Sequence, residues 1–97
     1  MVSMTRTLAL EVGSKKIRVN AVSPGAIETE GLKVYFDSLP DAERAAAHAE
    51  LMSWHPLGRF GTPKDIAEVV LFLCTDRAAF IHGAEIVADG GMLARLF

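Results

Sequence analysis

The sequence predicts an α/β fold in which helices cover a parallel sheet. Segments with apolar residues at helical spacing alternate with short runs rich in β-branched residues. The stretch between the two strand-like runs is long enough to hold a helical crossover, which parallel strands require and antiparallel strands do not. The expected order is therefore helix, strand, loop with a lid-like helix, helix and strand.

The first helix is expected over residues 1–12, and Gly13 is suited to end it. Its apolar residues recur at helical spacing: Met1, Met4, Leu8 and Val12. Residues 17–23 (IRVNAVS) then indicate a buried strand, because the run is short and β-branched. Pro24-Gly25 should end this strand, since proline cannot donate to a ladder and glycine frees the turn.

Residues 25–38 are expected to form an irregular loop or a short broken helix. A lid-like helix follows from about residue 40 to 52, with Ser38 or Asp37 near its start. Its alanines favour helix but give only a weak apolar face. We therefore expect a lightly anchored element.

The strongest helix prediction begins at Thr62, which can act as the N-cap before Pro63 and three residues before Asp65, as in a capping box. One face is apolar at helical spacing: Ile66, Val69, Val70 and Leu73. Further apolar residues lie off that face and predict a helix covered on more than one side: Leu71, Phe72 and Cys74.

A last short strand is expected at residues 85–88 (EIVA), closed by a turn at Asp89-Gly90-Gly91. Two strands are too few for an independent parallel sheet, whose faces and edges are normally covered. The strand at residues 17–23 would keep one edge unpaired. The sequence therefore indicates part of a larger sheet.

Composition limits the possible partners. The 97 residues carry a formal net charge of −2, which provides no basic surface for nucleic acid or an anionic membrane. The longest apolar run, residues 69–74, is far too short to span a membrane, and no secretory leader is expected at the start. The single cysteine, Cys74, suits a reducing cytoplasm.

Four segments, in this order and spacing, resemble the carboxyl-terminal portion of the short-chain dehydrogenase/reductase family. They are residues 4–11, IRVNAVSPG (17–25), HPLGRFGTPKDIAEVVLFL (55–73) and FIHGAEIVADGG (80–91). The resemblance runs from about Val2 to Gly91. It implies a Rossmann-type, doubly wound parallel sheet of which residues 1–97 form the carboxyl-terminal portion, with residues 31–54 as the variable substrate loop or lid. It also implies oxidation or reduction of an alcohol–carbonyl pair with NAD or NADP.

The family places the loop after Pro24 and Gly25 against the nicotinamide. By this resemblance Pro24 and Gly25 shape the turn, the backbone of Ile27 meets the carboxamide, and the Thr29 hydroxyl bonds the carboxamide or a phosphate. The chemistry is reasonable in itself, because a carboxamide needs one donor and one acceptor and α/β sheets bind ligands at the carboxyl ends of their strands. The alternative for Thr29 is an ordinary loop hydroxyl.

The resemblance also suggests that Tyr35, Phe36 and Leu39 line a substrate pocket; the alternative is simple packing of the lid. The family's catalytic Tyr-x-x-x-Lys is missing, because Tyr35 is the only tyrosine and Leu39 stands where the motif needs lysine. We expect the family's catalytic residues to align before Met1. Gly58 and Gly61 do not have the spacing of a phosphate-binding loop.

Other chemistry-bearing residues favour structural interpretations. The histidines are too scattered for a metal site and are expected in turns or facing solvent; the alternative for His48 is that it faces the substrate. Cys74 is expected to be a buried apolar residue rather than a nucleophile. Glu28 and Glu30 are expected to form a solvated acidic rim.

Three functions remain. The first is a carboxyl-terminal part of an oxidoreductase, inactive alone because the acid–base pair and the dinucleotide loop are absent. The second is a non-catalytic remnant that associates with itself through residues 63–74 and 84–88, where the family oligomerises. The third, an independent enzyme with other chemistry, lacks any acid–base or nucleophile set.

Overall fold

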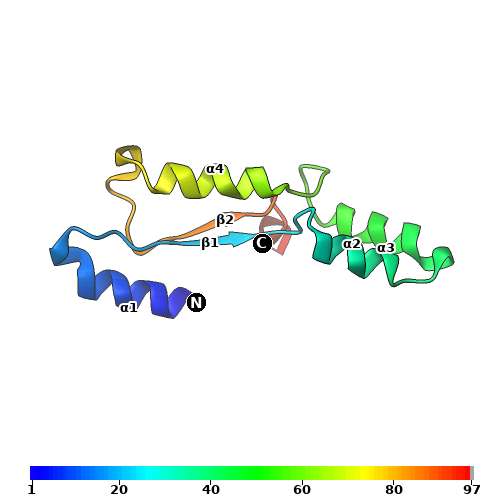
Figure 1. Ribbon diagram of the computed structural model, residues 1–97, viewed down its shortest axis with the longest axis horizontal. Helices are drawn as coiled ribbons and strands as arrows, with labels where there is room; N and C mark the ends of the chain where they lie inside the picture. The colour runs from blue at the N-terminus through cyan, green and yellow to red at the C-terminus, as the bar shows by residue number, and fades with distance from the viewer. Residues whose placement is uncertain (97) are drawn as a thin grey trace.

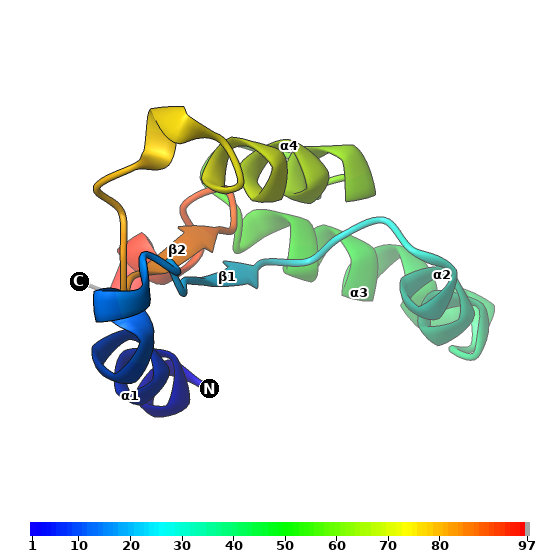
Figure 2. The ribbon, with the colours of Figure 1, turned by 60° about the vertical axis from the view of Figure 1, so that its left-hand side comes forward.

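A computed structural model describes residues 1–96, and its elements follow the predicted order (Figure 1). The helices and strands are α1 (Val2–Val12), β1 (Ala21–Pro24), α2 (Glu30–Asp37), α3 (Asp41–Ser53), α4 (Pro63–Leu73) and β2 (Glu85–Ala88). Short 3-10 turns occur at Gly13–Lys15, Asp76–Ala78 and Leu93–Leu96. The fold is α/β, with α1 and α4 on opposite sides of the sheet (Figures 1 and 2).

The chain is elongated, because the hairpin formed by α2 and α3 extends beyond the end of the sheet (Figure 1). Its extents are 56 × 29 × 23 Å and its radius of gyration is 16.7 Å. A compact domain of this length would have a radius of gyration of about 13 Å. The chain therefore buries less of itself than an ordinary domain does.

The strands pair in parallel as predicted, from Ala21 opposite Glu85 to Pro24 opposite Ala88. The prediction of a strand over 17–23 was wrong at both ends, because β1 starts at Ala21 and includes Pro24. Ala21 and Gly25 donate to β2 and its lead-in, over 2.9 and 3.1 Å. Groups alternate along a ladder, so the nitrogen of Pro24 faces the unpaired edge, where a missing N–H costs nothing.

The residues before β1 are tied to the chain before β2 largely by a side chain. The Asn20 amide donates to the Ile81 carbonyl and accepts from the Ala84 N–H, each over 3.0 Å. The Val19 carbonyl accepts from the Gly83 N–H over 2.7 Å. Asn20 thus takes the place of ladder hydrogen bonds, which explains why β1 begins late.

Helix α4 begins as predicted. Thr62 Oγ1 accepts from the Asp65 N–H over 3.2 Å, and the Asp65 carboxylate accepts from the Thr62 N–H over 2.8 Å, which completes the capping box. The prediction that α4 is covered on more than one side was wrong. Leu71 and Phe72 are 60% and 43% exposed, and Cys74 is also exposed rather than buried, because the sheet covers one side of the helix.

The lid consists of two helices, α2 and α3, and α2 is the short helix that the sequence offered as the alternative to an irregular loop over residues 25–38. Thr29 caps α2 by accepting from the Leu32 N–H over 3.2 Å. Pro40, and not Ser38 or Asp37, is the N-cap residue of α3. The Ser38 hydroxyl instead donates to the Tyr35 carbonyl over 2.6 Å, at the end of α2.

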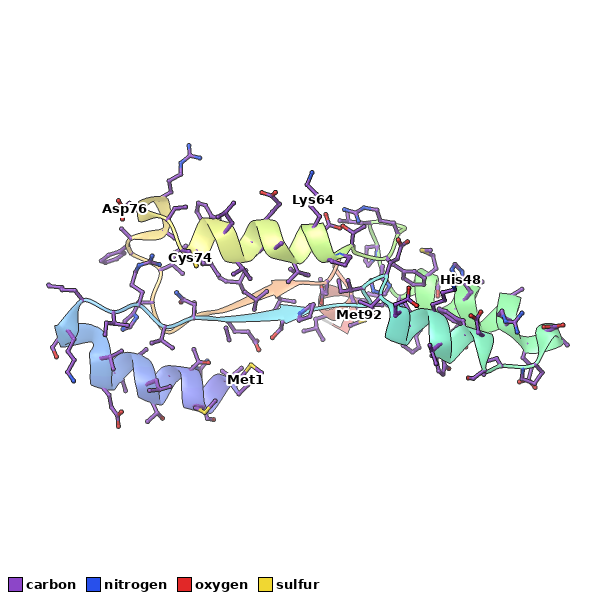
Figure 3. The ribbon with its side chains drawn as sticks, in the orientation of Figure 1. Met1, His48, Lys64, Cys74, Asp76 and Met92 are labelled. Carbon is purple, nitrogen blue, oxygen red and sulfur yellow. The ribbon has the colours of Figure 1, made fainter. Side chains whose placement is uncertain are left out.

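The buried core is small. Its apolar members are Ala9, Ala21, Phe36, Phe60 and Ala78. Helix α1 forms with Gly13 at its end, as predicted, but Met1 and Met4 on its apolar face are 82% and 62% exposed. Figure 3 shows Met1 at the free end of this helix. None of the helices in residues 1–96 is long and apolar enough to cross a membrane.

Candidate functional site at the carboxyl ends of the strands

Three loops meet where β1 and β2 end: residues 24–29, 55–61 and 89–93, called the loop cluster below. A Cβ on Gly25 would lie 2.8 Å from Asp89 Cα and 2.9 Å from Asp89 Cβ. Glycine is thus needed because the loop after β1 touches the backbone that follows β2. Gly90 and Gly91 have φ of 64° and 92° and form the predicted turn. Figure 3 places Met92 beside this junction.

Ile27 pairs with Gly61 in an isolated parallel bridge. The Gly61 N–H donates to the Ala26 carbonyl over 2.9 Å, and the Gly61 carbonyl accepts from the Glu28 N–H over 2.8 Å. In a parallel bridge the residue between those two partners directs its own N–H and C=O to the other side. Ile27 therefore presents one donor and one acceptor away from Gly61.

Thr29 stands two residues beyond Ile27, at the start of α2. Its hydroxyl oxygen accepts the Leu32 N–H, which leaves the hydroxyl hydrogen available for donation. The loop thus offers a donor and an acceptor at Ile27 and a second donor at Thr29. A carboxamide and a neighbouring oxygen could use all of these groups.

His55 lies beneath this loop and is 3% exposed. Its Nε2 accepts from the Ala26 N–H over 3.3 Å, and its Nδ1 lies 2.9 Å from the Leu51 carbonyl. Because Nε2 accepts, the ring is neutral and carries its hydrogen on Nδ1. Sequence reasoning missed this role, whereas His48 and His82 are exposed as expected. No local pattern marks His55, since its partner Ala26 lies 29 residues away.

Asp89 is a second buried polar residue that the sequence did not single out, 8% exposed. Its carboxylate accepts from the N–H groups of Gly91 and Leu93 over 2.9 and 3.0 Å. The pKa of Asp89 lies below its ordinary value, and the hydrogen bond from Leu93 is the largest cause. Hydrogen bonds from Gly91 and Met92 also lower this pKa, whereas desolvation raises it. Asp89 therefore carries a negative charge within the loop cluster.

Arg59 and Asp65 form an ion pair over 2.7 Å at the start of α4. The hydrogen bond from Arg59 is the largest cause that lowers the pKa of Asp65, and the same bond raises the pKa of Arg59. Both side chains are more than a third exposed, so water screens much of their attraction. The pair supports the capping box rather than forming a reactive site.

An open cleft of about 940 Å³ adjoins the loop cluster. Gly25, Ala26 and Ile27 line one part of it, and Leu57, Val87 and Leu93 add apolar surface elsewhere. Thr29 lies outside this lining. Clefts at the carboxyl ends of parallel strands are the usual ligand sites of α/β folds.

The predicted substrate residues lie on and just after α2, away from the cleft. Tyr35 is 52% exposed, Leu39 is half-buried, and Phe36 is 8% exposed. The Phe36 ring lies 5.2 Å from the His48 ring and 6.3 Å from the Phe60 ring. Phe36 thus joins the lid to the loop cluster, which is the packing role that the sequence left open beside the substrate role.

Glu28 and Glu30 are exposed. No group of three or more His, Cys, Asp or Glu side chains within residues 1–96 is arranged to hold a metal ion.

The chain forms part of a Rossmann-type α/β fold. This follows from the parallel pairing of β1 and β2, the crossover through α4 and the cleft at the carboxyl ends of the strands. Residues 1–93 match the family model described as enoyl-(acyl carrier protein) reductase. The chain belongs to the short-chain dehydrogenase/reductase family.

Curated relatives cover nearly all of this chain. It is 41% identical over 97% of its length to 2-(S)-hydroxypropyl-CoM dehydrogenase 3 of Xanthobacter autotrophicus, of which it spans 36%. It is also 41% identical, over 96% of its length, to the 3-oxoacyl-(acyl-carrier-protein) reductase FabG of Thermotoga maritima, of which it spans 35%. The chain therefore spans about a third of these relatives.

Solved structures agree with the fold. A short-chain dehydrogenase/reductase from Burkholderia xenovorans superposes with a TM-score of 0.89 at 35% identity, over 98% of this chain and 36% of the other. A 4-hydroxyisoleucine dehydrogenase complexed with NADH gives a TM-score of 0.84 at 36% identity, over 96% of this chain and 36% of the other.

Proposed function

We propose that this chain is the carboxyl-terminal third of an NAD(P)-dependent oxidoreductase and carries its nicotinamide-side loop. The outward N–H and C=O of Ile27 are the observation that supports this most directly. With the Thr29 hydroxyl they match the donor and acceptor of a carboxamide and one neighbouring oxygen. Solved relatives bound to NADH and to NADP support a nicotinamide cofactor.

In this proposal a bound nicotinamide gives or takes the hydride for an alcohol–carbonyl substrate. Ile27 orients the carboxamide, Thr29 donates to it or to a phosphate, and Pro24 and Gly25 fix the turn. Tyr35, Phe36 and Leu39 belong to the substrate side of the lid. Catalysis also needs an acid–base pair, which this sequence lacks, so the segment that the family places before Met1 would supply it.

The chain alone is accordingly expected to reduce no carbonyl compound. Its hydrogen bonds to a nicotinamide would contribute about 1 kcal/mol each, too little to offset the cost of association. We expect NAD and NADP to bind more weakly than about 1 mM. Micromolar binding in a calorimeter would contradict this expectation.

The complete function is tested by supplying the missing part. The segment of the Thermotoga maritima reductase that precedes its match to this chain would be co-expressed with residues 1–97. We expect NAD(P)H-dependent carbonyl reduction only when both parts are present. Thr29→Val should lower kcat/KM about tenfold, because it removes the hydrogen bond to the cofactor and the cap of α2, and Thr29→Ser, which keeps both, should restore it.

The matched control is Thr7→Val, which removes an exposed hydroxyl on α1 that donates to the Ser3 carbonyl. It should leave kcat/KM unchanged. A complex that forms but shows no turnover, or equal losses from Thr29→Val and Thr7→Val, would refute the proposed function.

A second candidate is self-association as a non-catalytic module, favoured by exposed apolar residues on α4 and β2. Leu71 is 60% exposed and Val87 is 41% exposed. Residues 63–74 and 84–88 would then join two copies at roughly micromolar concentration. Leu71→Glu should give monomers in sedimentation, whereas the matched variant Leu10→Glu on α1 should not; equal effects would refute this interface.

We also propose that the protein is cytoplasmic and that it binds neither nucleic acid nor membranes.

A further inference from the structure

The backbone of Ala26 sets the direction of the loop that follows β1. Its carbonyl accepts the Gly61 N–H over 2.9 Å, and its N–H donates to His55 Nε2 over 3.3 Å. Ile27 comes next in the chain, so the aim of its outward groups depends on how Ala26 is held. Ala26 thus has two hydrogen-bond partners: the backbone of Gly61 and the titratable ring of His55.

Protonation of His55 would break one specific contact. An imidazolium donates from both nitrogens and accepts from neither. The contact between Nδ1 and the Leu51 carbonyl would persist, whereas Nε2–H and the Ala26 N–H would face each other as two donors. The loop would therefore have to move away from the ring.

The groups around His55 come from each packed segment. Ala26 contributes an N–H from the loop after β1, Leu51 a carbonyl from α3, and Phe60 a ring whose centroid lies 5.7 Å away. Asp89, after β2, is the charged group near His55, since a positive charge on His55 is one of the causes that lower the pKa of Asp89. Its carboxylate would attract an imidazolium, so a proton on His55 meets an opposite charge while the contact to Ala26 is lost.

We propose that His55 is a positioning residue, which holds residues 24–29 in the cofactor-binding conformation only while its ring is neutral. The link to a cofactor rests on the proposed function. The stabilisation of the loop by His55 does not depend on the proposed function, and it can be measured without any cofactor. At low pH the loop should loosen although β1 and β2 remain paired.

Hydrogen exchange measured by mass spectrometry on the 97-residue chain tests this. Peptides covering residues 24–29 would be compared at about pH 5 and about pH 8, the range in which imidazoles titrate, after correction for intrinsic exchange rates. We expect protection to fall about tenfold at the lower pH, as for the loss of one hydrogen bond. His55→Gln keeps an acceptor that does not titrate and should stay protected at both values.

Two further variants complete the design. His55→Phe keeps a ring against Phe60 but has no acceptor, so the loop should be unprotected at both pH values. His82→Gln is the matched control, because His82 also has both ring nitrogens engaged but lies at the opposite ends of the strands. It should keep the pH dependence of the native loop.

A loop with equal protection at both pH values, or a His55→Gln variant that follows the native pH dependence, would overturn the proposal. In the complex with the amino-terminal segment, KM for the nucleotide should rise at low pH in the native chain and not in His55→Gln. An exchange result as expected with an unchanged KM would overturn the role of His55 toward the cofactor. A failure of the proposed function would show instead as absent turnover with the exchange result intact.

Discussion

The loop cluster and α1 show two ways in which this chain holds its parts. In the loop cluster, hydrogen bonds join all three loops, and His55 and Asp89 are buried with their polar atoms bonded. Helix α1 is regular, yet Leu10 is 87% exposed and its link to the strands runs through His82. The loop cluster is therefore organised within this chain, whereas α1 offers apolar surface that this chain does not cover.

The difference follows from what each region needs. Loops are held by hydrogen bonds to neighbours, and these neighbours all lie within residues 24–93. An amphipathic helix is held by apolar area, and a sheet of two strands offers little of it. A cluster of loops can thus be held together locally in a part of a fold whose apolar core is incomplete.

The largest effect is expected from Gly25→Ala in the loop cluster. The added methyl would meet Asp89 backbone at 2.8 Å, so the ends of β1 and β2 must separate. We expect a loss of about 3 kcal/mol in the free energy of unfolding, measured with urea. The control is Gly31→Ala in α2, whose methyl would lie 3.7 Å from Thr29 Oγ1 and which should be stabilising by roughly 0.5 kcal/mol. Similar losses of stability in both variants would contradict the special role of Gly25.

The attachment of α1 is tested by His82→Ala. His82 Nε2 lies 2.7 Å from the Ala9 carbonyl and Nδ1 accepts from the Val19 N–H over 3.2 Å. Loss of both hydrogen bonds should lower the free energy of unfolding by about 2 kcal/mol. Hydrogen exchange should show α1 deprotected and residues 24–29 unchanged, while His48→Ala should spare α1; retained protection of α1 would show that it is held in another way.

A smaller effect is expected on acidification at the start of α4. The pKa of Asp65 is lowered in the folded chain, so its stabilisation is complete above the ordinary pKa of about 3.9 and is lost as pH falls below it. The urea midpoint should fall between about pH 5 and about pH 2, and less so in Asp65→Asn. Glu68→Gln, at an exposed position of the same helix, should behave like the native chain; equal acid responses of the native chain and Asp65→Asn would contradict the role of Asp65.

The smallest effect is expected from Leu10→Glu on α1. Because Leu10 is 87% exposed, the free energy of unfolding should change by less than about 0.5 kcal/mol. Thermal unfolding of the native and variant chains at equal concentration measures the change. A loss above about 1 kcal/mol would mean that α1 is covered in solution, and the contrast with the loop cluster would fail.

The sequence showed local signals and the parallel pairing of the two strands, but it did not show the element boundaries that depend on distant partners. The capping box at Thr62 and Asp65 spans three residues, so its pattern was visible. The strand boundaries at Ala21 and Pro24 depend on hydrogen bonds to β2, more than sixty residues away.

The lid illustrates the same limit. Helix α2 has eight residues and a glycine, which predicts little helix by itself. The packing of Phe36 against Phe60 supports it, and that contact joins distant segments. The roles of Ile27 and Thr29 toward a cofactor came from the family resemblance and stay a prediction, and the resemblance did not indicate the buried ring of His55 beneath the loop.

Pro24 also bears on how this chain would aggregate. Within β1, Val22 alone directs an N–H toward the open edge, because Ala21 and Ser23 face β2 and Pro24 has none to offer. A strand added there would find one donor and then a proline, which is how natural sheets discourage edge-to-edge growth. Copies that join through β2 would keep these proline-blocked edges on the outside, so assembly should stop at a closed pair instead of extending into fibres.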